Sequence, residues 1–259
     1  MPKIEVNGAR LFYTLSGKAD APVVMMSNSL GTALEMWQPQ LAAMESKFRL
    51  LRYDMRGHGS SDLVEEACSI STFGHDVLAL LDELQMDKVH FCGLSVGGVI
   101  GQWLGANAPD RLSSLILCNT AAKIGTPESW NQRIADVEQH GMAAITEAAL
   151  ERWFTPAFRL ASPDAVAPFR AMLLATNPRG YALVGAAIRD MDQRKLVEDI
   201  RVPTCVIAGE HDPATTLDDA KFLQARIPGA TLVPFPVAHI SNVEAAAQFN
   251  QAVIDFLSR

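Results

Sequence analysis

The 259-residue sequence has few cysteines, and none of them is spaced to bind a metal or to form a redox motif. The cysteines are Cys68, Cys92, Cys118 and Cys205. No C-x-x-C occurs, and three of the four lie in apolar, strand-like runs, which is typical of reduced thiols in a protein core. We therefore expect a cytoplasmic protein with no catalytic cysteine. Because no H-E-x-x-H or Cys/His ligand spacing is present either, we expect no metal and no cofactor.

The sequence also lacks a long hydrophobic run and a basic run. No stretch approaches the roughly 18 apolar residues of a membrane-spanning helix. The opening segment MPKIEVNG has no apolar region of the kind found in signal peptides. The formal net charge is -7, and Lys and Arg form no cluster. Nucleic acid and membranes are therefore not expected as partners.

Hydrophobic residues nevertheless make up 49% of the chain, enough for a large packed core. Two alternating runs flank Asn7-Gly8 and predict a hairpin. Beyond them, apolar runs typical of buried strands alternate with segments of helical periodicity. We predict strands at 23–28, 48–54, 88–93, 112–119, 204–210 and 231–237, and helices at 73–86, 96–109 and 243–257. This alternation predicts an α/β fold, a mostly parallel sheet with helices on both faces.

Residues 121–195 interrupt the alternation. They combine helical patterns, several prolines and many aromatic positions, and they contain no clear strand. Their net charge is +1, whereas the remainder of the chain carries -8. We predict that residues 1–120 and 196–259 form the core, and that residues 121–195 form a helical cap over the C-terminal edge of the sheet.

A single serine stands among glycines at the end of one predicted strand. Residues 93–97, GLSVG, match G-x-S-x-G between a strand and a helix, which is the context of a nucleophile elbow. A side chain at Gly93 or Gly97 would collide with the neighbouring strand and helix. Ser95 would project at the helix N-terminus, where negative charge is favoured. The motif is short, so a packing corner with an incidental serine is the alternative.

A nucleophilic serine needs a base, and the base needs an acid that orients it. Asp212 follows the strand predicted at 204–210, and His239 follows the last predicted strand. Loops after parallel strands gather at one edge of a sheet. Taken alone, each residue could be an ordinary loop residue, but the order Ser, Asp, His along the chain is that of a known hydrolase class.

With these loops in place, the whole chain resembles the α/β-hydrolase family. Residues 53–62, YDMRGHGSSD, are similar to the family's D-x-R-G-x-G-x-S segment, GEHDP to its acid loop and AHISNVE to its histidine loop. The resemblance implies an α/β-hydrolase fold. It also implies that Ser95 is the nucleophile, His239 the base and Asp212 the orienting acid.

The resemblance further implies an oxyanion hole made of two backbone amides. One is the N–H of Val96, directly after the nucleophile, and the other comes from the loop after the strand at 23–28. The family often has H-G-x-G in that loop, where this chain has SNSLGTALEMW. Counting back from Trp37 places Asn28 at the usual histidine and Leu30 at the donor position, with Ser29 as the alternative donor.

Within the family, SNSLGT…MW, DMRGHGSS and GLSVGG together are most similar to the enol-lactonase branch, which acts on 3-oxoadipate enol-lactone in the β-ketoadipate route of aromatic acid degradation. This resemblance implies a cofactor-free enzyme that opens a small anionic lactone through an acyl-enzyme. A substrate carboxylate needs a local cation. Arg133 lies three residues after Trp130, on the same helix face. We predict that both bind substrate, with Arg152 and Arg189 as other candidate cations.

Two alternatives remain open. The same three residues could serve a general carboxylesterase or a C–C bond hydrolase, which a panel of substrates would separate. The chain could also be a ligand receptor with very slow turnover. A steady-state assay would separate that case, because enzymes usually turn over roughly 1–1,000 times per second. The sequence does not fix an oligomeric state.

Overall fold

The chain begins with the predicted hairpin. In the computed structural model, which describes residues 3–258, β1 (Lys3–Val6) pairs antiparallel with β2 (Ala9–Gly17). Asn7 and Gly8 between them have φ values of 46° and 74°. Asn and Gly are the residues that adopt this left-handed backbone most readily, so the dipeptide sets the turn.

All six further strands lie where the sequence predicts them. They are β3 (Val23–Ser27), β4 (Arg49–Tyr53), β5 (Val89–Leu94), β6 (Leu112–Cys118), β7 (Thr204–Gly209) and β8 (Thr231–Phe235). The sheet order is β1-β2-β4-β3-β5-β6-β7-β8, and every pair from β4 to β8 is parallel. The predicted fold class is confirmed. The carboxyl ends of the parallel strands therefore meet at one edge of the sheet.

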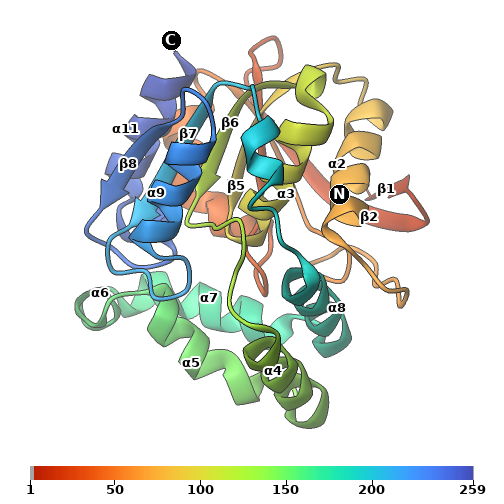
Figure 1. Ribbon diagram of the computed structural model, residues 1–259, viewed down its shortest axis with the longest axis vertical. Coiled ribbons are helices and arrows are strands. Elements are labelled where there is room, and N and C mark those ends of the chain that lie inside the picture. The colour runs from red at the N-terminus through yellow and green to blue at the C-terminus, as the bar shows by residue number, and fades with distance from the viewer. Residues whose placement is uncertain (1–2, 259) are drawn as a thin grey trace.

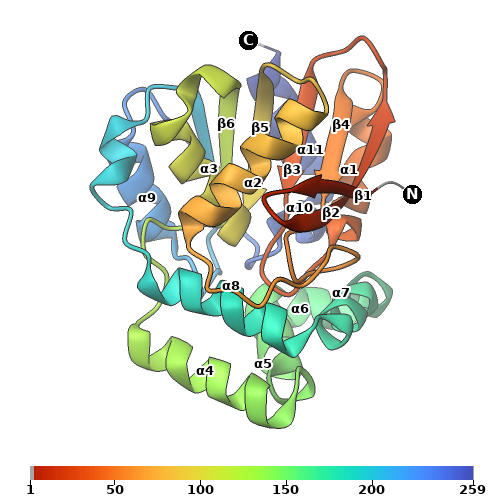
Figure 2. The same cartoon turned by 90° about the vertical axis from the view of Figure 1, so that its right-hand side faces the viewer.

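Helices cover both faces of this sheet (Figures 1 and 2). On one face α1 (Gln38–Met44) packs against α11 (Ala246–Leu257). The other face is covered by α2 (Ile70–Glu83), α3 (Val96–Asn107) and α9 (Leu217–Arg226). The five inner strands, β3 to β7, are almost wholly buried, which explains their near-continuous apolar runs. Short 3-10 turns at Leu34–Trp37, Pro109–Arg111 and Leu196–Asp199 complete the connections.

The prediction of a single helix at 243–257 is wrong in one respect, because the structure has two helices there. A short α10 (Ser241–Glu244) precedes α11, and Ala245 between them has non-helical angles of φ -123° and ψ 42°. Gln40 of α1 holds both helices: its Nε2 donates to the carbonyl oxygen of Asn242 in α10 at 2.7 Å and to Asn250 Oδ1 in α11 at 3.1 Å. Asn242 also donates a hydrogen bond to the carbonyl oxygen of Met36. The break lets α10 stay with the loop that carries His239.

Five helices lie between β6 and β7, and we call them the insertion: α4 (Pro127–His140), α5 (Ala143–Trp153), α6 (Pro156–Ala161), α7 (Pro163–Ala175) and α8 (Pro178–Asp190). They lie across the end of the sheet at which the parallel strands finish (Figures 1 and 2). Four of the five begin with proline, which fits the first helical position because no intrahelical N–H is needed there. That 121–195 is a distinct cap domain stays a prediction.

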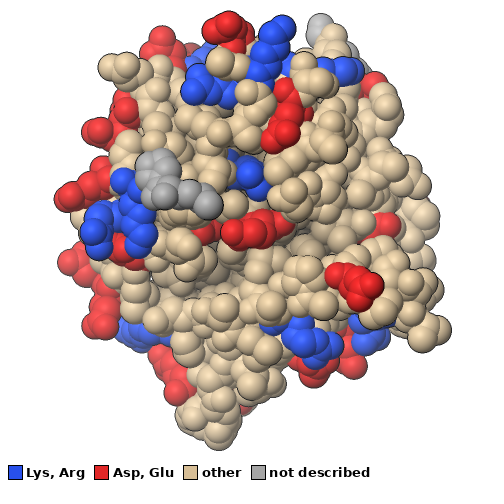
Figure 3. All heavy atoms as spheres, turned by 180° about the vertical axis from the view of Figure 1, so that it is seen from behind, with Lys and Arg blue, Asp and Glu red and all other residues tan. Residues whose placement is uncertain are grey.

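The surface and the cysteines agree with the composition. Within residues 3–258, none of the four cysteines forms a disulfide. Among the described residues on the face shown in Figure 3, Lys and Arg are interspersed with Asp and Glu and form no continuous basic surface. Within residues 3–258, no helix is both long enough and apolar enough to cross a membrane.

Candidate active site

Ser95 occupies a strained corner between β5 and α3. Its φ of 58° and ψ of -115° lie in a region that residues with a side chain rarely adopt. A Cβ at Gly93 would lie 2.2 Å from the carbonyl oxygen of Gly97, and a Cβ at Gly97 would lie 2.2 Å from that of Ser27. The predicted steric need for glycine at both positions is confirmed. The corner holds Ser95 at the edge of the sheet, with its side chain lining a small cavity.

His239 lines the same cavity as Ser95. Its Nδ1 atom contacts the carboxylate of Asp212. The distance from His239 Nδ1 to Asp212 Oδ2 is 2.7 Å, and both side chains are buried. Asp212 Oδ1 also accepts hydrogen bonds from the amides of Ala214 at 2.8 Å and Thr215 at 3.1 Å. The hydroxyl of Thr215 donates to Oδ2 at 2.7 Å.

These contacts keep the Asp212 carboxylate charged although it is buried. Burial acts to raise the pKa of Asp212, but the charge and hydrogen bond of His239 and the donors of Thr215 outweigh it, so the pKa lies below its usual value. An ionised acid that accepts from Nδ1 leaves the other histidine nitrogen free to act as a base. The structure thus brings the three predicted residues to one edge of the sheet.

Asn119 belongs to the same cluster, and sequence analysis missed it. It directly follows β6, is fully buried, and has a φ of 43°. Its Nδ2 donates to Asp212 Oδ2 at 3.1 Å and to the carbonyl oxygen of Ala238 at 3.2 Å, and its Oδ1 accepts from the Ser241 hydroxyl at 2.5 Å. Asn119 therefore joins the acid loop to the histidine loop. Its place at a strand end, like those of Asp212 and His239, was the available signal.

The loop after β3 bears on the choice of oxyanion donor. The amide of Ser29 donates to Met36 Sδ at 3.3 Å. Within residues 3–258, the amides of Leu30 and Val96 donate to no protein group. Leu30 also lines the cavity, and Val96 is the first residue of α3. Two free N–H groups beside Ser95 favour Leu30 over Ser29 as the second donor.

Asn28 stands where the family often has histidine, and it fixes this loop. Its Oδ1 accepts from Trp37 Nε1 at 2.9 Å, and its Nδ2 donates to the carbonyl oxygen of Tyr53 at 2.9 Å. Beside it, Asp54 accepts from the amides of Leu34 at 2.7 Å and Ser60 at 2.8 Å. Burial raises the pKa of Asp54 to about 6, against these stabilising donors.

The insertion contributes two cations to the cavity, and both were candidates in the sequence, Arg133 as first choice and Arg152 as an alternative. Arg133 of α4 and Arg152 of α5 both line it. Each is half-buried, and within residues 3–258 neither forms an ion pair with a carboxylate. Burial, together with the charge of Arg133, lowers the pKa of Arg152. Trp153 and Tyr181 lie against them in the same wall.

Two of the predicted substrate residues lie elsewhere. Trp130 does not line the cavity: its Nε1 donates to the carbonyl oxygen of Ile124 at 2.7 Å, and its ring supports the Arg133 guanidinium at 4.6 Å. Trp130 therefore contacts Arg133 from outside the cavity. Arg189 also lies outside the cavity, and it is bonded to Asp190 and Asn131.

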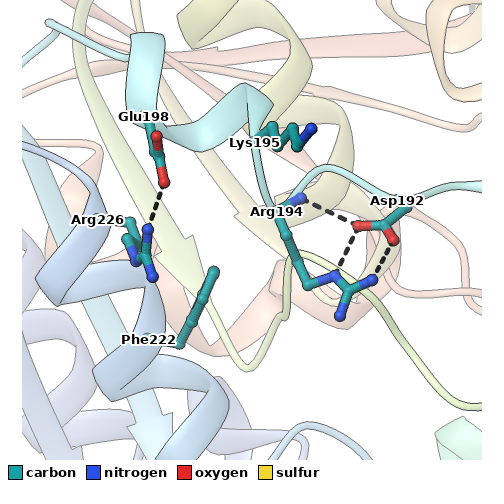
Figure 4. A pocket seen from close by; sticks show the side chains of 6 residues that line it. All are labelled: Asp192, Arg194, Lys195, Glu198, Phe222 and Arg226. Atoms are coloured by element: carbon teal, nitrogen blue, oxygen red, sulfur yellow. Dashed lines mark hydrogen bonds and ion pairs between the residues drawn. The ribbon is translucent and has the colours of Figure 1, made fainter.

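A wider groove of about 590 Å³ lies away from this cavity, between the 3-10 turn at Leu196–Asp199 and α9. Figure 4 shows four of its charged side chains in two pairs, Asp192 with Arg194 and Glu198 with Arg226, whereas Lys195 is paired with none of the residues drawn. None of these residues belongs to the cluster at Ser95. Among residues 3–258 there is also no group of three or more His, Cys, Asp or Glu side chains placed to hold a metal ion.

Comparison with known proteins agrees with this geometry. The alpha/beta hydrolase fold family matches residues 22–246. The chain is 42% identical to 3-oxoadipate enol-lactonase 2 of Acinetobacter baylyi, over 96% of this chain and 93% of that protein. It is 31% identical to the protein of Variovorax paradoxus named "Putative carbamate hydrolase RutD", over 96% of both.

A solved structure is similar over the full length. The crystal structure of the enol-lactonase from Burkholderia xenovorans LB400 superposes with a TM-score of 0.98 at 42% identity, covering 100% of both chains. The predicted resemblance is confirmed, as is the prediction of an enzyme. The chain belongs to the alpha/beta hydrolase fold family and is a carboxylic ester hydrolase.

Proposed function

We propose that the enzyme opens 3-oxoadipate enol-lactone to 3-oxoadipate, in the β-ketoadipate route of aromatic compound degradation in the cytoplasm. His239 removes the proton of the Ser95 hydroxyl, and Ser95 Oγ attacks the lactone carbonyl. The amides of Leu30 and Val96 stabilise the oxyanion that forms. The ring C–O bond then breaks, and the ring oxygen takes the proton from His239 and leaves as an enol. No cofactor is required.

The second half of the reaction restores the serine. The enol becomes a ketone, and a ketone oxygen does not attack the acyl-enzyme, so the lactone ring does not form again. Water then attacks the acyl-enzyme carbonyl, with His239 again as the base, and Ser95 leaves with its proton. Throughout, Asp212 keeps His239 in the tautomer that presents its free nitrogen to Ser95.

One observation carries the choice of substrate class: Arg133 and Arg152 face the cavity beside Ser95 without a carboxylate partner. Cations held close together in a partly buried wall repel each other, and an anion between them would relieve that cost. The enol-lactone carries one free carboxylate. A carbamate ester and a simple neutral ester carry none, so they would leave both cations unpaired. The two enol-lactonase relatives support the same choice.

The small size of the cavity supports a role for the insertion as a cap. The cavity measures about 50 Å³, whereas ligand pockets usually measure roughly 300 Å³ or more. A six-carbon lactone does not fit unless α4, α5 or α8 moves outward. We infer that the insertion opens for substrate and closes over it, which excludes water during acylation.

Relative values of kcat/KM test this proposal. We expect the enol-lactone to exceed a small neutral aryl ester by at least about 100-fold, since one charge pair in a partly buried site contributes roughly 2–5 kcal/mol. A neutral ester or a carbamate hydrolysed as well as the enol-lactone would contradict the assignment.

A further inference from the structure

The carboxylate of Glu244 joins two segments that are far apart in the sequence. On one side it accepts a hydrogen bond from the amide of Ala238, the residue before His239, at 3.1 Å. On the other side it accepts from the amide of Thr155, at 3.2 Å to Oε2, and from the Thr155 hydroxyl. Glu244 ends α10, and Thr155 lies in the insertion between α5 and α6.

A further hydrogen bond ties the same two segments. The amide of Ile240 donates to the carbonyl oxygen of Trp153 at 3.0 Å. Trp153 and its neighbour Arg152 line the cavity at Ser95. Residues 153–155 and 238–244 therefore form one hydrogen-bonded unit that carries the predicted base on one side and part of the cavity wall on the other.

The chemistry of this contact calls for a carboxylate. Every group that meets Glu244 here is a donor, and an ionised carboxylate offers acceptors only. A glutamine would turn its NH₂ group toward one of these donors. Within residues 3–258, Glu244 forms no ion pair with Lys, Arg or His, so its charge is satisfied by these N–H and O–H groups. Charge-assisted hydrogen bonds of this kind are roughly twice as strong as neutral ones.

We propose that Glu244 is a positioning residue that fixes the α5–α6 corner of the insertion to the histidine loop. It thereby sets the distance between the carboxylate-binding cation Arg152 and the base His239. The inference rests on the proposed function for the roles of these two residues, but the contact itself does not. When the insertion opens for substrate, this corner stays with the core and the other helices move.

The contact is tested first without substrate, by hydrogen exchange of backbone amides. In Glu244→Ala and Glu244→Gln, the amides of residues 155 and 238 should exchange at least tenfold faster than in the wild type. Glu198→Gln is the matched control, because Glu198 pairs with Arg226 in the separate groove of Figure 4. Unchanged exchange at both amides would overturn the proposal, whatever the substrate of the enzyme is.

Kinetics on two substrates then test the positioning role. For Glu244→Ala we expect KM for the enol-lactone to rise about tenfold and kcat to fall about fivefold. The neutral ester should show only the fall in kcat, because it does not use Arg152. Equal changes in KM for both substrates would overturn the positioning role. A wild-type enzyme that ignores the enol-lactone would instead contradict the proposed function, and the exchange measurement would still decide the contact.

Changes at Thr155 separate the insertion side from the histidine side. Thr155→Val removes the hydroxyl donor and leaves the Ala238 bond, so KM for the enol-lactone should rise while kcat stays within twofold. Thr155→Ser keeps the hydroxyl and should restore KM. If Thr155→Val leaves KM for the enol-lactone unchanged, the hydroxyl has only its local role at the start of α6, where it accepts from the Phe158 amide, and the proposal fails.

Discussion

The two walls of the cavity hold their polar side chains in different ways. On the sheet edge, Ser95, Asp212 and His239 are at most 9% exposed, and each lies in a loop directly after a parallel strand. Thr215 and Asn119 also donate hydrogen bonds to the carboxylate of Asp212. Protein groups thus hold Asp212 and His239 in place, so the geometry of this pair is set before any ligand arrives.

The insertion wall is not satisfied in this way. Arg133 and Arg152 are half-buried and have no carboxylate partner in the part of the chain that the structure describes. Unpaired cations are costly in a protein wall and are retained where a ligand supplies the counter-charge. We therefore expect the sheet edge to carry out the reaction and the insertion to recognise the substrate. Changes at the sheet edge should lower turnover of every substrate, whereas changes in the insertion should affect some substrates more than others.

The largest effect should follow removal of the nucleophile. Ser95→Ala should lower kcat by at least about 10⁴-fold on both the enol-lactone and a neutral ester, because the acyl-enzyme route is lost. His239→Ala should be comparable. Steady-state rates with matched melting temperatures check this. A folded Ser95→Ala that keeps activity within tenfold of the wild type would refute the role of Ser95.

Loss of the acid should come next. In the wild type, several donors converge on Asp212 Oδ2. In Asp212→Asn, an NH₂ group competes with these donors, and the histidine tautomer that suits catalysis is lost. We expect kcat to fall about 10³- to 10⁴-fold on both substrates. His211→Ala is the control, because His211 is exposed and adjacent. A larger loss for His211→Ala than for Asp212→Asn would reverse the assignment.

In the insertion, the effect should depend on the substrate. Arg133→Met and Arg152→Met should each lower kcat/KM for the enol-lactone about 10- to 100-fold, the lower part of the range for charged pairs because both side chains are partly exposed. A neutral ester should lose less than threefold. Arg189→Met, at a cation outside the cavity, should leave both substrates unaffected. Equal losses on both substrates would give these arginines a packing role and remove the contrast between the walls.

The same contrast explains what the sequence could predict. The sheet edge follows from local pattern: apolar runs define the strands, and the residues after their ends converge because the strands are parallel. Gly93 and Gly97 mark the corner because no side chain fits there. That Ser95, Asp212 and His239 lie close together was therefore predictable without any knowledge of helix packing.

The insertion wall was harder to predict, because it depends on how helices pack against the core. Sequence periodicity places Arg133 and Trp130 on one face of α4, and the 4.6 Å stacking agrees, but only Arg133 reaches the cavity. The approach of Arg152 from α5 depends on the tilt between helices. Glu244 and Asn119 act through neighbours distant in sequence, and no short motif encodes such contacts.

A smaller effect on turnover should come from Asn119, which supports the sheet-edge wall from behind. Asn119→Leu removes the bonds to Asp212 and Ala238, and we expect kcat to fall about tenfold on both substrates. Asn119→Asp would place a second carboxylate beside Asp212 and favour the protonated histidine, so the acid limb of the kcat/KM profile should move to higher pH. An unmoved acid limb in Asn119→Asp would limit Asn119 to a structural role.

The smallest effect should appear in stability alone, where the two walls meet behind the cavity. The loop after β4 contacts α8 so closely that a Cβ at Gly180 would lie 2.2 Å from the carbonyl oxygen of Gly57. His58 follows and is fully buried. Burial lowers the pKa of His58 from 6.5 to about 4.

Between pH 6.5 and about 4 the unfolded chain therefore binds a proton at His58 that the folded chain excludes, so stability falls on acidification. The shift corresponds to at most about 3 kcal/mol. Asp54, with its pKa raised to about 6, acts in the opposite sense, because protonation favours the folded state there. Comparison with His58→Leu cancels the Asp54 contribution. Denaturant unfolding at pH 6.5 and 4 should show the wild type losing more stability than His58→Leu, and parallel losses would show that His58 accepts a proton in the folded protein.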